Sequence, residues 1–105
     1  MASKNKRRGN TYEYEVVKEF TERGYKAERS WGSDGRSLGL DAEVDVRAFV
    51  DNKPLHIQCK RRKKLPEYIY PNNVHAVFVR EDRKESLVVI TMENFLRLLK
   101  GDDLT

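Results

Sequence analysis

The stretch that decides the fold runs from Glu43 to Lys60 and reads EVDVRAFVDNKPLHIQCK. Apolar and polar residues alternate with a period of two in 43–50 and again in 54–60, a pattern typical of β-strands that bury one face. Asp51-Asn52-Lys53, between the two runs, is composed of turn-forming residues. The stretch therefore predicts a β-hairpin, around which the remaining elements can be arranged.

The length of the turn decides which residues of the hairpin face each other. A two-residue turn at Asp51-Asn52 places Asp45 across from Gln58, a four-residue turn places it across from Lys60, and a three-residue turn breaks the parity. Strict alternation puts Asp45 with Glu43 and Arg47, opposite the face of Val44, Val46, Ala48 and Val50. The carboxylate of Asp45, the amide of Gln58 and the ammonium of Lys60 would then share one sheet face. The same pattern also fits an ordinary solvent-facing side of an antiparallel pair.

Upstream of the hairpin, residues 10–23 have the apolar spacing of a helix that Gly24 ends. Val16, Val17 and Phe20 define one face of this helix, and Glu13 lies near the centre of that face. A carboxylate aimed at the core needs a cation, a metal or hydrogen bonds, because burying it alone costs several kcal/mol. The alternative is an acid in the first turn that the helix dipole favours.

The other elements follow from local patterns. Residues 25–31 predict a short strand and 32–41 an irregular, glycine-containing loop. After the hairpin, Pro66 and Pro71 allow at most a helical turn or an extended excursion, and residues 74–80 and 87–91 predict a second hairpin. Thr91 is positioned to cap a final helix over 92–100. The expected order is αβββ, a short connection, then ββα.

Length and composition favour a single domain over residues 1–105, with a modest core and a partner subunit as an expected source of stability. No apolar run approaches the ~18 residues of a membrane span and no secretory signal is recognisable, so we expect an intracellular, cytoplasmic protein. Cys59 is the single cysteine and cannot alone form a disulfide or a zinc cluster. A glycine-rich phosphate loop is lacking, and no organic cofactor is expected.

The formal charge of +4 is concentrated in two clusters. One precedes the first helix, in residues 1–9, which we expect to form a flexible basic arm; the other is the run of five cations at 60–64. Charge alone fits a phosphate-binding surface no better than a solvated face or tail. Oxygen ligands without a histidine or cysteine cluster favour a hard cation such as Mg²⁺ or Mn²⁺.

Several of these residues occur together at spacings that resemble the PD-(D/E)XK nuclease superfamily, and within it the archaeal-type Holliday junction resolvases. The resemblance spans residues 6–64, and its motifs are Arg8-Gly9, Glu13, Arg23-Gly24-Tyr25, Arg29, Ser33, Asp45 in VDVRA and Gln58 to Lys60 in IQCK. The chain departs from the pattern at Gln58, where the family usually has a second acid, and at Tyr14, where resolvases tend to carry a basic residue. The helix that normally follows the strand motif is also shortened, which puts junction specificity in doubt more than nuclease chemistry.

The resemblance implies a restriction-endonuclease-like α/β (α+β) core, with a central mixed five-stranded sheet and a helix at each end of the chain. It implies one or two Mg²⁺ ions, with Mn²⁺ able to substitute, held by Glu13, Asp45, Gln58 and the main-chain carbonyl of Cys59. Lys60 would then orient or deprotonate the attacking water, or stabilise the pentacovalent phosphate. Gln58 contributes no charge, so weaker metal affinity is expected.

The function implied is a metal-dependent endonuclease, active as a homodimer on branched DNA in recombination or repair, whether the gene is cellular or viral. Two alternatives stay open: a nicking or restriction-like nuclease on duplex DNA, and a DNA-binding module of the same fold that cuts nothing. The residues expected to contact DNA share a positive charge or a place on the loop, and they are Lys4, Lys6, Arg7, Arg8, Arg29, Ser33, Arg36, Arg61, Arg62, Lys63 and Lys64.

Overall fold

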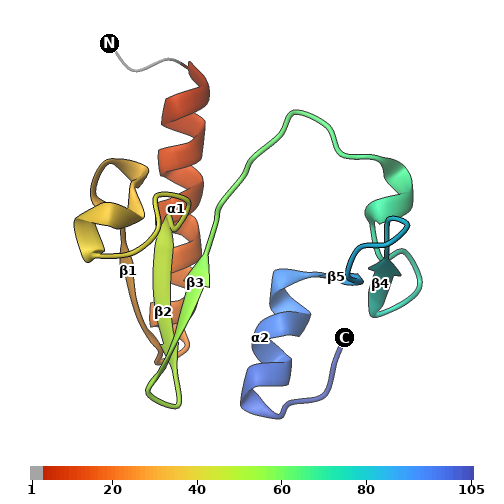
Figure 1. Ribbon diagram of the computed structural model, residues 1–105. Coiled ribbons are helices and arrows are strands. Elements are labelled where there is room, and N and C mark those ends of the chain that lie inside the picture. The colour runs from red at the N-terminus through yellow and green to blue at the C-terminus, as the bar shows by residue number, and fades with distance from the viewer. Residues whose placement is uncertain (1–3) are drawn as a thin grey trace. The chain divides into compact units, whose positions relative to one another are not determined.

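The computed structural model of the protein describes the backbone of residues 4–105, and the side chains of residues 11–105 except that of Ser33. The chain divides into two compact units, Met1–Arg62 and Lys63–Thr105 (Figure 1). Each unit has its own small sheet and one α-helix. None of the helices in the described part of the chain is long and apolar enough to cross a membrane.

The first unit is built on an antiparallel sheet of three strands in the order β1-β2-β3. These strands are β1 (Lys26–Arg29), β2 (Val46–Val50) and β3 (Lys53–Ile57). β1 ends, β2 begins and β3 ends at the same end of the sheet (Figure 1), as the antiparallel pairing requires. Residues that follow or precede the strands at this end are thereby brought together.

The hairpin between β2 and β3 has the two-residue turn that places the strands in the first of the expected registers. Val50 pairs with Lys53 and Val46 with Ile57. Both turn residues have positive φ, 51° at Asp51 and 65° at Asn52. Positive φ at both central positions is the geometry of the type I′ turn, whose twist matches that of the strands it joins. Of the turn lengths left open by the sequence, the hairpin therefore has the two-residue turn.

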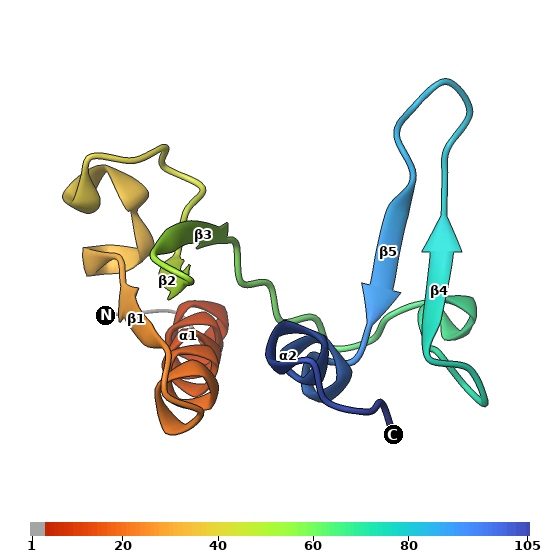
Figure 2. The ribbon, with the colours of Figure 1, turned by 90° about the horizontal axis from the view of Figure 1, so that it is seen from below.

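Helix α1 (Lys4–Glu22) covers one face of this sheet (Figure 2). It starts at Lys4, so it takes in most of the segment expected to be a basic arm; residues 1–3 lie outside the described part of the chain. Val16 and Phe20 are buried, as the periodicity predicts, and so are Val46 and Ala48 on the sheet. Burial of these side chains removes apolar surface from water and holds the unit together.

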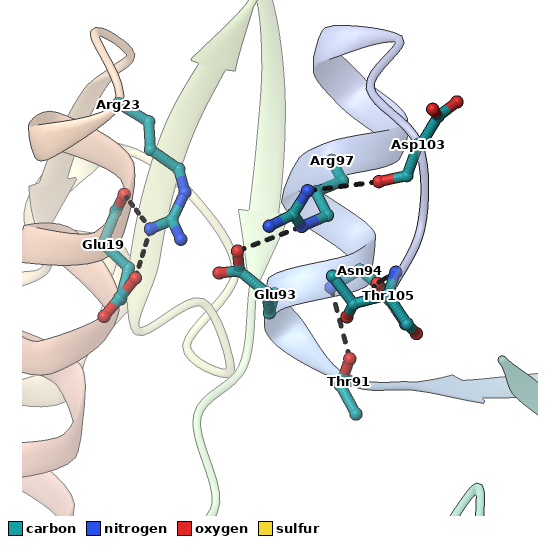
Figure 3. A network of polar contacts seen from close by, with 8 residues as sticks. All are labelled: Glu19, Arg23, Thr91, Glu93, Asn94, Arg97, Asp103 and Thr105. Atoms are coloured by element: carbon teal, nitrogen blue, oxygen red, sulfur yellow. Dashed lines mark hydrogen bonds and ion pairs between the residues drawn. The ribbon is translucent and has the colours of Figure 1, made fainter. Parts of the chain in front are cut away.

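The end of α1 is closed by polar contacts as well as by packing. The guanidinium of Arg23 contacts both the carbonyl oxygen and the carboxylate of Glu19, one turn earlier (Figure 3). Gly24 follows with φ of 89°, a left-handed conformation that glycine adopts at little cost.

The segment between β1 and β2 contains two short 3₁₀ helices, η1 (Trp31–Ser33) and η2 (Gly35–Leu38), where an irregular loop was expected. Gly35 is buried in this segment. A Cβ atom added there would lie 1.9 Å from the carbonyl oxygen of Asp41, so only glycine fits. This close approach fixes the path of the chain toward β2.

The second unit contains the turn η3 (Glu67–Ile69), the hairpin of β4 (Ala76–Val79) and β5 (Leu87–Ile90), and helix α2 (Met92–Lys100). The second hairpin and the single helical turn between the prolines are confirmed. Val77 pairs with Val89 in the middle of the two-stranded sheet.

Helix α2 is capped at both ends by residues the sequence singles out. Thr91 Oγ1 accepts a hydrogen bond from the main-chain N–H of Asn94, and Gly101 ends the helix with φ of 76°. The buried Asn94 also bonds Thr105, donating from Nδ2 and accepting at Oδ1 from the main-chain N–H, at 3.2 and 2.9 Å. Figure 3 shows this network with Arg97, which bonds Glu93 and the carbonyl of Asp103.

The single mixed five-stranded sheet expected from the resemblance is wrong. The α+β content and all five strands are present, but they form one sheet of three strands and another of two, each antiparallel throughout. Each strand pairs only with its neighbours in sequence: β2–β3 and β4–β5 are hairpins, and β1 is joined to β2 by the segment 30–45 that contains η1 and η2. Pro54 lies in the edge strand β3 and has no main-chain N–H to donate to a further strand, which makes this edge a poor place to extend the sheet.

Candidate active site

A buried acid lies on α1, within its apolar face. Glu13 is 3% exposed, so the expectation that it points into the core is confirmed. Its Oε1 accepts a hydrogen bond of 2.9 Å from Nε of Arg29, at the end of β1. Arg29 lies on the sheet face that packs against α1, because it pairs with the buried Val46. The required cation is therefore an arginine that sequence reasoning had assigned to DNA.

Arg29 is held by two neighbours on α1. Its guanidinium lies 4.4 Å from the centre of the Tyr14 ring, a cation–π contact. Burial acts to lower the pKa of Arg29, but the hydrogen bond and the negative charge of Glu13 outweigh it and the net pKa is raised. Arg29 is thus a permanent cation in the site. Alternation in the short strand, with Ala27 and Arg29 on one face, is the sequence signal that could have found this role.

A second buried acid, Asp45, stands where the regular ladder of β2 and β3 breaks. Its main-chain N–H donates to the carbonyl of Ile57 at 2.9 Å, while Ile57 is also the partner of Val46. Two residues of one strand facing one of the other make a β-bulge, which turns a side chain away from its alternating position. Asp45 is only 8% exposed, and the prediction that it shares the face of Arg47 is wrong.

Three charged side chains lie within electrostatic range of Asp45. Burial raises the pKa of the Asp45 carboxyl, and the negative charge of Glu13 raises it further. The positive charges of Lys60 and Arg29 act in the opposite direction, as does the main-chain N–H of Cys59, which donates to Asp45 Oδ2 at 2.8 Å. Glu13, Arg29, Asp45 and Lys60 therefore form one charged cluster at the end of the sheet.

Cys59 contributes its backbone to this cluster and not a reactive thiol. Burial, with the charges of Asp45 and Glu13, raises the pKa of the Cys59 thiol to about 12. A thiol with so high a pKa is protonated at neutral pH and is a poor nucleophile.

Ser30 fixes the bulge from the other side and was missed by sequence reasoning. It is fully buried, its hydroxyl donates to the carbonyl of Val44 at 2.5 Å, and its main-chain N–H donates to the carbonyl of Asp45 at 2.8 Å. The backbone on both sides of the Asp45 side chain is thereby held. A lone serine after a short strand gives no distinctive signal in the sequence.

Gln58, the third predicted ligand, has the fewest contacts to hold its side chain. Gln58 follows the last residue of β3 and is exposed, and no hydrogen bond of its side chain is found in residues 11–105. No group of three histidine, cysteine, aspartate or glutamate side chains in the described residues could hold a metal ion. Two carboxylates that act on each other remain, and oxygen donors of this kind fit one hard cation, with further ligands from an amide or main-chain oxygen.

Apart from Arg29, which bonds Glu13, the residues expected to contact DNA fall into three groups. Arg36 is exposed and its Nε bonds both carboxylate oxygens of Asp34 at 3.0 and 2.9 Å, which offsets part of its charge. The run after β3 is exposed along its length, at Lys60, Arg61, Arg62, Lys63 and Lys64. The side chains of Lys4, Lys6, Arg7, Arg8 and Ser33 lie outside those that the structure describes.

Comparison with known proteins agrees with the resemblance of the motifs. Residues 4–105 match the profile of a family described as archaeal Holliday junction resolvase (Hjc), which covers almost the whole chain. Comparisons with curated proteins and with solved structures gave no match. The chain therefore belongs to the archaeal Holliday junction resolvase family, whose members are nucleases acting on DNA.

Proposed function

We propose that the protein is a metal-dependent, structure-selective endonuclease that hydrolyses phosphodiester bonds in branched DNA such as Holliday junctions. The observation that carries the proposal is the pairing of two buried acids, Glu13 and Asp45, with Lys60 at one end of a sheet in a chain of this family. The family match spans both compact units, which supports a single nuclease domain over residues 1–105.

The donor set suits Mg²⁺ or Mn²⁺. Glu13 and Asp45 would supply charged oxygens, and Gln58 and the carbonyl of Cys59 neutral ones. A bound divalent ion lowers the pKa of its water and stabilises charge on the scissile phosphate. Because Gln58 is neutral and exposed, binding should be weaker than with a third acid.

The protein's own side chains would have distinct tasks in hydrolysis. Lys60 lies close enough for its charge to act on Asp45, and from there it would orient the attacking water or stabilise the charged phosphate. Arg29 holds Glu13 in place through its 2.9 Å hydrogen bond, which makes it a positioning residue. Cys59 fixes Asp45 by its main-chain N–H.

Binding to DNA would rest on the exposed cations after β3, together with Lys4, Lys6, Arg7, Arg8, Arg36 and Ser33. Contacts of this kind recognise the backbone and weaken steeply with salt. A homodimer would present two sites for the two strands cut in a junction. The second unit offers apolar surface for such an interface, at Phe78, Leu87, Val88 and Leu98.

The test is incubation of the protein with a labelled four-way junction and a linear duplex of the same sequence, with Mg²⁺ or Mn²⁺. Paired symmetric cuts near the branch are expected. Asp45→Ala should abolish cleavage and leave junction binding in EDTA nearly unchanged, whereas Asp41→Ala, which removes an exposed acid nearby, should leave cleavage intact. Cutting of the duplex alone would replace this proposal with a restriction-like nuclease.

One observation favours a second function, a DNA-binding module that does not cut. The described residues lack a third charged ligand beside Glu13 and Asp45, and Gln58 stands where the family usually has an acid. Gln58→Glu separates the two functions: it should tighten metal binding and raise the cleavage rate if Gln58 is a ligand. A protein that binds junctions yet yields no product, even as Gln58→Glu, would be the inactive module.

A further inference from the structure

The only tryptophan of the sequence, Trp31, is 84% exposed. It is the first residue of η1 and follows Ser30 directly. An indole ring presents a large apolar face that is usually covered in a folded protein. Neither the hydrolytic roles nor the basic surface uses this side chain.

Trp31 lies beside the charged cluster because Ser30 bridges them. The main-chain N–H of Ser30 donates to the carbonyl of Asp45 at 2.8 Å. Ser30 follows Arg29, the partner of Val46, and so lies opposite Asp45. Opposite residues of an antiparallel pair have Cα atoms roughly 4.5–5.5 Å apart, and the next Cα is about 3.8 Å further on. The Cα of Trp31 is therefore at most about 9 Å from that of Asp45, a distance of roughly three base steps of about 3.4 Å along one DNA strand.

The backbone of Trp31 is fixed although its ring is exposed. Its main-chain N–H donates to Ser37 Oγ at 2.8 Å, and its carbonyl accepts from the main-chain N–H of Asp34 at 3.3 Å. Gly35, close to Asp41, anchors the same segment. An aromatic ring on an ordered backbone binds its ligand at a lower entropic cost than one on a flexible loop, because the backbone need not be ordered on binding.

We propose that Trp31 stacks on a nucleobase face exposed at the branch point of the DNA, next to the bond that is cut. This rests on the proposed junction nuclease and adds a residue that selects the branch. Every base has a π-face, so stacking is independent of sequence, whereas an intact duplex keeps its base faces covered. The exposed cations Lys60 and Arg61 would hold the phosphates of the same strand.

Because Trp31 is the only tryptophan, its fluorescence reports on stacking directly. The wild-type protein is titrated in EDTA, without cleavage, with a four-way junction and with a linear duplex of the same sequence. At saturation the junction should quench the fluorescence much more than the duplex. Equal quenching by the two DNAs, or none by either, overturns the proposal.

Three variants make the test quantitative. Trp31→Ala should raise the Kd for the junction roughly 5- to 150-fold, the range typical of losing one stacked base, and leave the Kd for the duplex unchanged. Trp31→Phe should keep most of the affinity. Tyr68→Ala, which removes an aromatic ring of similar exposure from the second unit, is the matched control and should change neither Kd. Equal losses on junction and duplex for Trp31→Ala would overturn the proposal.

The outcome does not depend on whether the protein cuts junctions. If Mg²⁺ assays show cleavage of linear duplex only, the proposed function fails, while quenching by the junction in EDTA still supports stacking by Trp31. If junctions are cut but Trp31 is not quenched, the nuclease stands and the stacking role is overturned.

Discussion

Replacing Arg29 by methionine should destabilise the metal-free protein by about 3 kcal/mol. The Glu13 side chain is 4% exposed and that of Arg29 18%, and Nε and Oε1 are 2.9 Å apart. Removing one partner of a buried pair costs about 3–5 kcal/mol, whereas exposed pairs contribute about 0–1 kcal/mol. The partial exposure of Arg29 places the loss at the lower end of the buried range. For a chain of this length the melting temperature should fall by roughly 12–24 °C.

The assay is urea unfolding in EDTA at pH 7, applied as a double-mutant cycle. Glu13→Gln removes the buried charge that loses its arginine partner in Arg29→Met, so the double variant should be about 2 kcal/mol more stable than the sum of the single effects predicts. Additive losses, or a loss below about 1 kcal/mol for Arg29→Met, would refute the inference that Arg29 is the counter-ion of Glu13.

The same variants test the link between this ion pair and the metal. In Arg29→Met, the guanidinium that bonds Glu13 is missing, so saturating Mg²⁺ should stabilise this variant more than the wild type. Glu13→Gln, which lacks the carboxylate, should be stabilised by Mg²⁺ less than the wild type. An identical stabilisation of all three proteins by Mg²⁺ would argue against Glu13 as a ligand.

Three further predictions concern other parts of the site. Because the pKa of Asp45 is raised on folding, its protonated form stabilises the protein below the unfolded pKa of about 3.9, and this stability is lost as pH rises through the folded pKa. The free energy of unfolding of Asp45→Asn, measured with urea in EDTA, should therefore increase relative to that of the wild type as pH rises from 3 to 7. A difference between the two proteins that does not change with pH would contradict the burial of the charge. Gly35→Ala should destabilise the protein by more than 2 kcal/mol in thermal unfolding, since its Cβ would meet Asp41, whereas Gly39→Ala, with φ of 75° but open space, should cost about 1 kcal/mol; similar losses would exclude the close approach as the cause. Cys59, with a pKa of about 12 against an ordinary 9.0, should react with a thiol reagent in EDTA about 1000-fold more slowly than in the unfolded chain, and a comparable rate would show the thiol to be open.

Local patterns in the sequence were sufficient for the elements that neighbours in the chain define. The type I′ turn at Asp51-Asn52 follows from two residues that tolerate positive φ between alternating runs. The capping of α2 by Thr91 and Gly101 follows from residue types with a known role at helix ends. Glu13 was also found from periodicity, since helix geometry alone directs it toward the core.

Features that depend on contacts between distant segments were not accessible in the same way. The bulge at Asp45 depends on main-chain hydrogen bonds to β3 on one side and to Ser30 on the other. No residue type in the sequence indicates where such a bulge will form. Alternation therefore placed Asp45 on the wrong face of the sheet. The partner of Glu13 was missed because an arginine in a strand is equally suited to DNA and to a buried acid. The strands form two sheets because no strand of the first hairpin pairs with a strand of the second. The sequence did not reveal this, since pairing between distant strands leaves no local pattern whose presence or absence can be read.

The bulge between Asp45 and Val46 also makes this family member sensitive to the length of its chain and not only to its residue types. Deleting one residue ahead of Val46 would remove the extra residue and let the ladder with β3 continue in regular alternation. The apolar residues Val46 and Ala48 would keep their places, so the core would survive while the carboxylate turned to the opposite face. Loss of a single codon here would therefore redirect one buried carboxylate while the core of the first unit stayed folded.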